Sequence, residues 1–170
     1  AEFKQALLDL IEKEDPMTLH GYSPTLGIPS VKTAIAESLN CRFDMNYGPE
    51  NIFPVSAAAA AIAHALRAVT VPGDEVLTFA PFFPEYHPYV DLTGAVLKVV
   101  PADTKSFQIN FEAFEEMLGP RVAAVLVNTP NNPSGAVYSA ETLTKLAEVL
   151  TRKAEQYGHD IFLISDEPYR

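Results

Sequence analysis

The hydrophobic residues follow two patterns that alternate along the chain. In five stretches they recur at intervals of three and four residues, which is the spacing of an amphipathic helix. These stretches are residues 1–14, 30–39, 57–69, 110–117 and 139–150. Pro29-Ser30, Asn110 and Ser139 are typical of a helix start, and Pro72-Gly73 is typical of the segment after a helix. The pattern therefore predicts five helices.

The second pattern consists of short apolar runs, which predict strands. They are residues 51–56, 75–80, 95–100, 122–127 and 161–165. The fourth and fifth runs are almost wholly apolar, as is typical of strands buried inside a protein. Because strands and helices alternate, we predict an α/β protein, a three-layer α/β/α sandwich around a mostly parallel sheet. Ligands of such sheets bind beyond the carboxyl ends of the strands.

The acidic composition argues against several classes of partner. Against 12 lysines and arginines the chain carries 22 acidic residues, so its net charge is −10. Nucleic acid and anionic membranes repel such a chain, and no apolar run approaches the roughly 20 residues of a membrane span. Residues 1–14 look like an amphipathic helix rather than a signal peptide, so we expect a cytoplasmic protein.

Metal and thiol chemistry are not indicated. Cys41 is the only cysteine, so the sequence predicts neither an internal disulfide nor a thiolate metal cluster. The four histidines lie far apart and lack the spacing of metal ligands: His20, His64, His87 and His159. No metal site is therefore predicted.

Two loops that follow predicted strands carry polar residues suited to binding. Residues 128–135 read Asn-Thr-Pro-Asn-Asn-Pro-Ser-Gly, a stiff turn that projects amide side chains over the edge of the sheet. In the loop 165–170, Asp166 follows a run of apolar residues. A partly desolvated carboxylate favours a cationic partner, such as a protonated ring nitrogen. A connecting loop and a solvated acidic loop are the alternative interpretations.

Two further stretches suit a phosphate and a flat ring. Residues 56–61, a serine followed by five alanines, join a strand to a helix, and their small side chains let a ligand approach the free N–H groups of the helix start. Residues 81–86, Pro-Phe-Phe-Pro-Glu-Tyr, offer an aromatic face. A plain alanine-rich helix and ordinary core packing are the alternative interpretations.

In this order, the four stretches resemble fold type I enzymes that depend on pyridoxal 5'-phosphate (PLP), in particular the class I and II aminotransferases related to aspartate aminotransferase. The Pro-Gly-Asp-Glu-Val of residues 72–76, the Asn-Pro-Ser-Gly turn and residues 165–169 match that family, as does Tyr22 with Gly27. The resemblance implies an N-terminal segment over residues 1–45 and part of the large, PLP-binding domain over residues 46–170. It also implies that the strand at 51–56 lies apart from the other four, which form one sheet.

The resemblance implies which residues contact the ring of the cofactor. Asp166 would pair with the pyridine nitrogen and keep it protonated, so that the ring accepts electrons from the substrate. Asn132 and Tyr169 would hydrogen-bond the phenolic oxygen, and Asn132 would also reach a substrate carboxylate. Phe83 would stack on the ring.

The phosphate is implied to bind where the alanine-rich helix starts. The N–H groups of Ala58 and Ala59, next to Ala57, would hold it, and Tyr22 would reach the phosphate of the neighbouring subunit in a homodimer. Many relatives carry glycine in place of Ala57 and a hydroxyl residue near Ala59. The lost hydroxyl, worth about 1 kcal/mol, predicts weaker binding.

A larger departure concerns the lysine that binds PLP as a Schiff base. In the family it lies some tens of residues after the Asp-Glu-Pro-Tyr motif, hence beyond Arg170, and a phosphate-binding arginine follows it. Four lysines after residue 90 precede the motif and do not match that position: Lys98, Lys105, Lys145 and Lys153. We therefore predict that the chain is part of such an enzyme and is inactive alone.

The implied function is the transfer of an amino group between an amino acid and a 2-oxo acid. A lyase, a racemase or an aminocyclopropane-carboxylate synthase of the same class is an alternative. So is a non-catalytic PLP-sensing domain of a transcription regulator, although no basic segment precedes Ala1. A nucleotide-binding α/β domain is disfavoured, because the chain has no Gly-x-Gly-x-x-Gly or Walker-type loop.

Overall fold

The computed structural model describes residues 1–169, which form two compact units. The first unit, Ala1–Pro54, is helical, whereas the second begins at Val55 and contains a sheet. None of the helices in residues 1–169 is long and apolar enough to cross a lipid bilayer. The chain therefore divides near Pro54 into a helical part and an α/β part.

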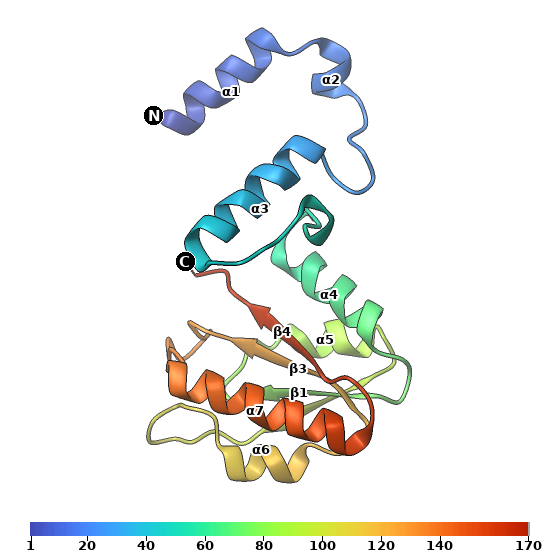
Figure 1. Ribbon diagram of the computed structural model, residues 1–170, viewed down its shortest axis with the longest axis vertical. Coiled ribbons are helices and arrows are strands. Elements are labelled where there is room, and N and C mark those ends of the chain that lie inside the picture. Colours follow the sequence, from blue (N-terminus) through green and yellow to red (C-terminus); the bar gives the residue numbers. More distant parts are fainter. Residues whose placement is uncertain (170) are drawn as a thin grey trace. The chain divides into compact units, whose positions relative to one another are not determined.

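The first unit is built from short helices whose starts are marked in the sequence. Its elements are α1 (Glu2–Lys13), α2 (Pro16–His20), α3 (Pro29–Phe43) and the 3-10 helix η1 (Pro49–Asn51) (Figure 1). Asp15 caps α2 by accepting hydrogen bonds from the N–H groups of Met17 and Thr18, at 2.9 and 3.1 Å. α1 lies where the helical spacing predicts it, yet none of its residues is buried.

The second unit is a three-layer α/β/α sandwich, which confirms the predicted fold class. Four parallel strands form one sheet in the order β2-β1-β3-β4. The strands are β1 (Glu75–Phe79), β2 (Val96–Val100), β3 (Val122–Asn128) and β4 (Phe162–Asp166) (Figure 1). The helices are α4 (Ala58–Val69), α5 (Tyr86–Asp91), α6 (Phe111–Met117) and α7 (Ala140–Tyr157).

Within the described residues, an apolar cluster lies on each face of the sheet and holds the layers together. Neighbouring residues of a strand face opposite sides. Leu77 of β1 therefore packs in the cluster beneath α6 and α7, with Phe114 and Leu146. Val76 packs in the cluster beneath α4 and α5, with Leu66. Figure 1 shows these two helix pairs on either side of the sheet.

The structure corrects two expectations about strands. The run at 51–56 is not a strand: η1 ends at Asn51, and the residues up to Val55 have no regular structure, because no described strand pairs with them. The run at 161–165 forms β4 but is not buried, because β3 is its one neighbour among the described strands. Phe162 and Leu163 are accordingly 45% and 46% exposed.

The strand order creates a point at which the chain reverses direction across the sheet. β2 lies on one side of β1, whereas β3 and β4 lie on the other. The connections that leave the carboxyl ends of β1 and β3 run to opposite faces, toward α5 and α7. In open parallel sheets this topology leaves a crevice between the two connections, and ligands bind there.

Candidate functional site

A cavity of about 260 Å³ lies beyond the carboxyl ends of β3 and β4. Its wall comes from five parts of the chain: the start of α4, the aromatic stretch after β1, helix α5, the end of β3 with the turn that follows it, and the end of β4 with its loop. The lining residues are Ala58, Ala59, Ile62, Phe83, Tyr89, Asn128, Asn132, Asp166, Pro168 and Tyr169. The fold therefore brings the four stretches singled out from the sequence to one place.

Most of the residues predicted to bind the cofactor line this cavity, with two exceptions. Ala57 is the N-cap residue of α4, directly before the lining residues Ala58 and Ala59. Tyr22 belongs to the first unit, where its side chain is fully exposed. Its predicted role at a neighbouring subunit stays a prediction.

The register between β3 and β4 fixes two polar residues side by side. Asn128 ends β3 and pairs with Asp166, which ends β4. The Asn128 amide donates a hydrogen bond of 2.9 Å to the backbone oxygen of Asp166, while its Oδ1 accepts one of 2.7 Å from the N–H group of Asn132. The buried Asn128 side chain thus joins two of the four residues predicted to contact the cofactor ring.

The turn after β3 is also tied to the loop after β1. The Asn131 amide donates to the backbone oxygen of Pro81 at 3.1 Å, and its Oδ1 accepts from the hydroxyl and the N–H group of Ser134, at 2.7 and 3.1 Å. These bonds span the two connections that diverge at the reversal point. They fix the turn that carries Asn132 against the stretch that carries Phe83.

The carboxylate of Asp166 has a buried partner. The Tyr86 hydroxyl donates a hydrogen bond of 2.6 Å to Oδ2 of Asp166. Burial first, and then this bond to a carboxylate, raises the pKa of Tyr86 well above its ordinary value. Because the hydroxyl holds its proton across the physiological pH range, it acts as a donor and not as a base.

The start of α4 combines free N–H groups with strained backbone. Ala57 has φ 76° and ψ 151°, a conformation that glycine adopts readily and alanine rarely. The N–H of Ala61 is the first to bond back within the helix, to the oxygen of Ala57 at 3.3 Å. The N–H groups of Ala58 and Ala59 precede it, at the positive end of the helix dipole, where a phosphate is stabilised.

No lysine of residues 1–169 lines the cavity. Lys98 pairs with Glu75 near the opposite ends of the strands, with Nζ at 2.8 Å from Oε2. Lys145 and Lys153 lie on α7 and pack over the rings of Phe111 and Tyr157.

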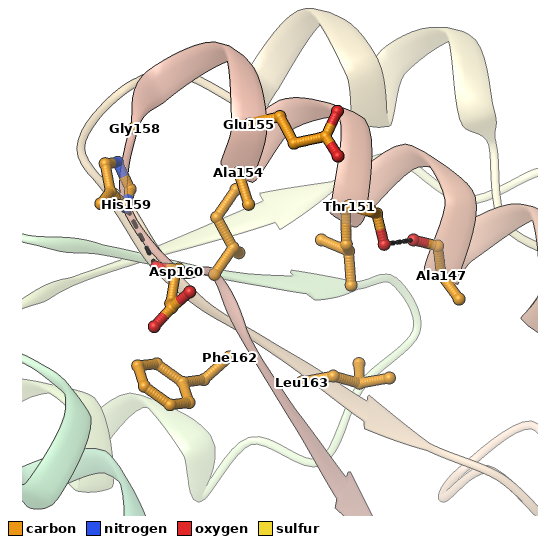
Figure 2. Close-up of a pocket in the computed structure, with 11 residues that line it drawn as sticks. Ala147, Thr151, Ala154, Glu155, Gly158, His159, Asp160, Phe162 and Leu163 are labelled. Carbon is orange, nitrogen blue, oxygen red and sulfur yellow. Dashed lines mark hydrogen bonds between the residues drawn. The ribbon is translucent and has the colours of Figure 1, made fainter.

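A larger hollow of about 710 Å³ lies between α7 and the exposed edge of β4. Figure 2 shows Thr151 and Ala154 of α7 and Phe162 and Leu163 of β4 around it, with His159 and Asp160 at the turn between the two elements. The residues predicted to bind a ligand are not among those lining it. We therefore place the functional site at the smaller cavity.

Sequence reasoning missed several residues of the site. Asn128 belongs to the stretch 128–135 that the sequence singles out, but the sequence assigns it no contact in the site. Tyr86 was noticed within the aromatic stretch but not as a partner of Asp166. Ile62 and Tyr89, on α4 and α5, gave no signal because their spacing is that of core residues.

Comparison with known proteins identifies the family. The model of the family "Aminotransferase class I and II" matches residues 2–170. A probable aspartate/prephenate aminotransferase of Aquifex aeolicus is 36% identical over 149 residues, which are 87% of this chain and 36% of the relative. The aspartate aminotransferase of Thermotoga maritima is 33% identical, again over 87% of this chain and over 38% of its own.

Solved structures agree. A crystal structure of an aminotransferase from Eubacterium rectale superposes with a TM-score of 0.96 at 42% identity, over 98% of this chain and 42% of that chain. Aspartate aminotransferase of Thermus thermophilus with maleate gives a TM-score of 0.84 at 31% identity, over 98% and 41%. The chain thus spans about two fifths of the length of its relatives.

The fold and the cavity define a protein with an open α/β sheet and a ligand site at its carboxyl edge. The chain belongs to the class I and II aminotransferase family, which confirms the resemblance seen in the sequence. The cofactor of this family is PLP.

The chemistry of the cavity fits this cofactor. Asp166 would supply a carboxylate to a protonated pyridine nitrogen, and Asn132 and Tyr169 would supply donors to a phenolic oxygen. Phe83 would supply a flat apolar face, and the start of α4 would supply N–H groups to a phosphate.

Proposed function

We propose that the protein containing this chain is a PLP-dependent aminotransferase, which moves an amino group between an amino acid and a 2-oxo acid. One observation carries the proposal: Asp166, Asn132, Phe83 and the start of α4 surround a single cavity at the reversal point of the sheet. Aminotransferase relatives that match 87% of the chain support this reaction over the other reactions of the same cofactor.

Bound PLP would supply an electron-accepting ring for the substrate's α-carbon. The residues of the chain bind and orient that ring. The Asp166 carboxylate stabilises a positive charge on the ring nitrogen, since an opposite charge within hydrogen-bond reach favours the protonated form. Phe83 covers the ring, and Asn132 and Tyr169 hold its phenolic oxygen. The Asn132 amide is also available to a substrate carboxylate.

Further features belong to the same proposal. The cofactor-binding domain covers residues 46–170 and follows an N-terminal segment over residues 1–45. The protein is a cytoplasmic homodimer, in which Tyr22 reaches the phosphate in the neighbouring subunit. Relatives named for aspartate and prephenate support amino-acid and 2-oxo-acid substrates.

Replacement of the Asp166 carboxylate tests the proposal. In the full-length protein that contains this chain, we expect Asp166→Asn to lower transaminase turnover at least 100-fold, because an amide cannot balance the charge of a protonated ring nitrogen. The matched control is Asp160→Asn, which removes a carboxylate next to β4 but outside the cavity.

Turnover is measured with an amino acid and 2-oxoglutarate, and PLP binding by absorbance and fluorescence titration. The control variant should keep the activity of the unmodified protein within about twofold, because exposed surface changes have small effects. Failure of the unmodified protein to bind PLP would contradict the proposal, as would an Asp166→Asn variant as active as the control.

A further inference from the structure

We propose that Tyr86 is a positioning residue, which holds the Asp166 carboxylate in the orientation that receives the ring nitrogen of the cofactor. The inference rests on the proposed function, since it assigns Asp166 to that nitrogen. The geometry that carries it is the hydrogen bond of 2.6 Å from the Tyr86 hydroxyl to Oδ2 of Asp166.

Tyr86 has little freedom to move. Its side chain is fully buried in the apolar cluster beneath α4 and α5, and it is the first residue of α5. The Phe82 ring stacks at 6.4 Å between centroids, and the Phe83 ring meets Tyr86 edge-on at 5.8 Å. The hydroxyl is therefore a donor at a fixed point beside the cavity.

The turn of residues 83–86 also fixes the position of Phe83. The N–H group of Tyr86 donates a hydrogen bond of 3.1 Å to the backbone oxygen of Phe83. Phe83 lines the cavity and is predicted to cover the ring. One short segment thus sets the position of the stacking residue and the orientation of the carboxylate.

Asp166 is fixed from two sides. Asn128 holds its backbone oxygen at 2.9 Å, and Tyr86 holds Oδ2 of its side chain. An oxygen that already accepts one strong hydrogen bond is a weaker acceptor for a second. Oδ1 is therefore the oxygen that a ring nitrogen is expected to meet, and rotation of the carboxylate would break the bond to Tyr86.

The hydroxyl of Tyr86 is chemically suited to this role, because a tyrosine O–H donates a hydrogen bond to a carboxylate oxygen and brings no charge of its own. Burial and the bond to Asp166 raise the pKa of Tyr86, so the donor persists over the pH range in which such an enzyme works. If Tyr86 only filled the core, its ring would be needed but its hydroxyl would not.

Removing only the hydroxyl of Tyr86 distinguishes a role in positioning Asp166 from a role in core packing. The full-length protein and its Tyr86→Phe variant are titrated with PLP and with 1-deaza-PLP, in which a C–H group replaces the ring nitrogen. Both ligands share the aldehyde and the phosphate, so the ratio of their affinities isolates the contact of the nitrogen with Asp166. The matched control is Tyr138→Phe, which removes a tyrosine hydroxyl from the opposite apolar cluster.

We expect Tyr86→Phe to weaken PLP binding about tenfold, as the loss of a hydrogen bond to a charged group predicts, and to leave 1-deaza-PLP binding within about twofold. Tyr138→Phe should leave both affinities unchanged. If Tyr86→Phe weakens the binding of both ligands equally, or of neither, the positioning role is overturned while the proposed function stands. A native protein that binds neither ligand would overturn the proposed function and this inference with it.

A second measurement covers the case in which Tyr86→Phe does not fold. In the unmodified protein, tyrosine labelled with ¹³C at Cζ reports on the hydrogen bond of Tyr86. Binding of PLP should shift this resonance at least about twice as far as binding of 1-deaza-PLP, because only the former brings a charged nitrogen to Asp166. Equal shifts with the two ligands would contradict the inference.

Discussion

At the residue scale, Ala57 shows how a single methyl group affects the site. Its φ of 76° lies in a region that a Cβ atom makes unfavourable, and it directly precedes the N–H groups predicted to hold a phosphate. The resemblance to the family implies glycine at this position in many members, so the added methyl group is expected to weaken phosphate binding. The backbone conformation adds a second reason, which is strain at the helix start.

Ala57→Gly is therefore expected to raise the free energy of unfolding by about 1 kcal/mol, because the relief of strain exceeds the entropy cost of glycine. The same variant should bind PLP more tightly. Ala61→Gly is the matched control, since Ala61 lies within α4 and glycine there should lower the free energy of unfolding by about 1 kcal/mol. Urea denaturation measures both. A loss of stability in both variants would contradict the strain at Ala57.

At the scale of elements, Glu75 joins three strands at the ends opposite the cavity. Its side chain is 6% exposed and pairs with Lys98 of β2 at 2.8 Å and with Arg121, directly before β3, at 2.7 Å. Burial favours the neutral acid, but the two cations outweigh it and lower the pKa of Glu75 below 4.5. A group whose pKa is lowered on folding stabilises the fold above its unfolded pKa, and this contribution is lost as the pH falls through the folded pKa.

Glu75→Gln should accordingly lower the free energy of unfolding by about 1–3 kcal/mol at neutral pH, because the amide leaves both cations without a charged partner. The difference from the unmodified protein should shrink below pH 4.5. Glu148→Gln, at an exposed position of α7, controls for the loss of one negative charge. Thermal unfolding followed between pH 7 and pH 3 tests this, and a difference that does not depend on pH would contradict the ion-pair explanation.

Sequence patterns located most elements and some of their ends. Asn110 and Ser139 cap α6 and α7 as predicted, by accepting hydrogen bonds from the N–H groups of Ala113 and Thr142. Such caps depend on residues a few positions apart, so the sequence contains the whole signal. The run at 51–56 was wrong as a strand, since strand formation depends on a partner that no local pattern contains.

At the scale of the whole molecule, the chain matches about two fifths of the length of its relatives. One carboxylate, two amides and two phenols line the cavity, but no lysine of residues 1–169 does. Transamination needs an amine to anchor the cofactor and to move the proton at the substrate's α-carbon. The residues that line the cavity can therefore bind the cofactor, but transamination also needs an amine that they do not supply.

We therefore expect the chain of residues 1–170 to show no transaminase turnover and no lysine adduct after borohydride reduction with PLP. The full-length protein should show both. The assay mixes each protein with PLP, an amino acid and 2-oxoglutarate, and maps any reduced adduct by mass spectrometry. Turnover by residues 1–170 alone would contradict the need for an anchoring lysine outside them.

The fold class, the family and the residues expected at the cofactor can be predicted from the sequence alone, because these follow from local periodicity and from motifs of adjacent residues. How those residues come together depends on the tertiary structure. The register that sets Asn128 beside Asp166 and the hydrogen bond from Tyr86, 80 positions earlier in the chain, depend on how distant segments pack. The exposure of Phe162 and Leu163 was likewise undetermined, since an apolar run has the same pattern at the edge of a sheet as at its centre.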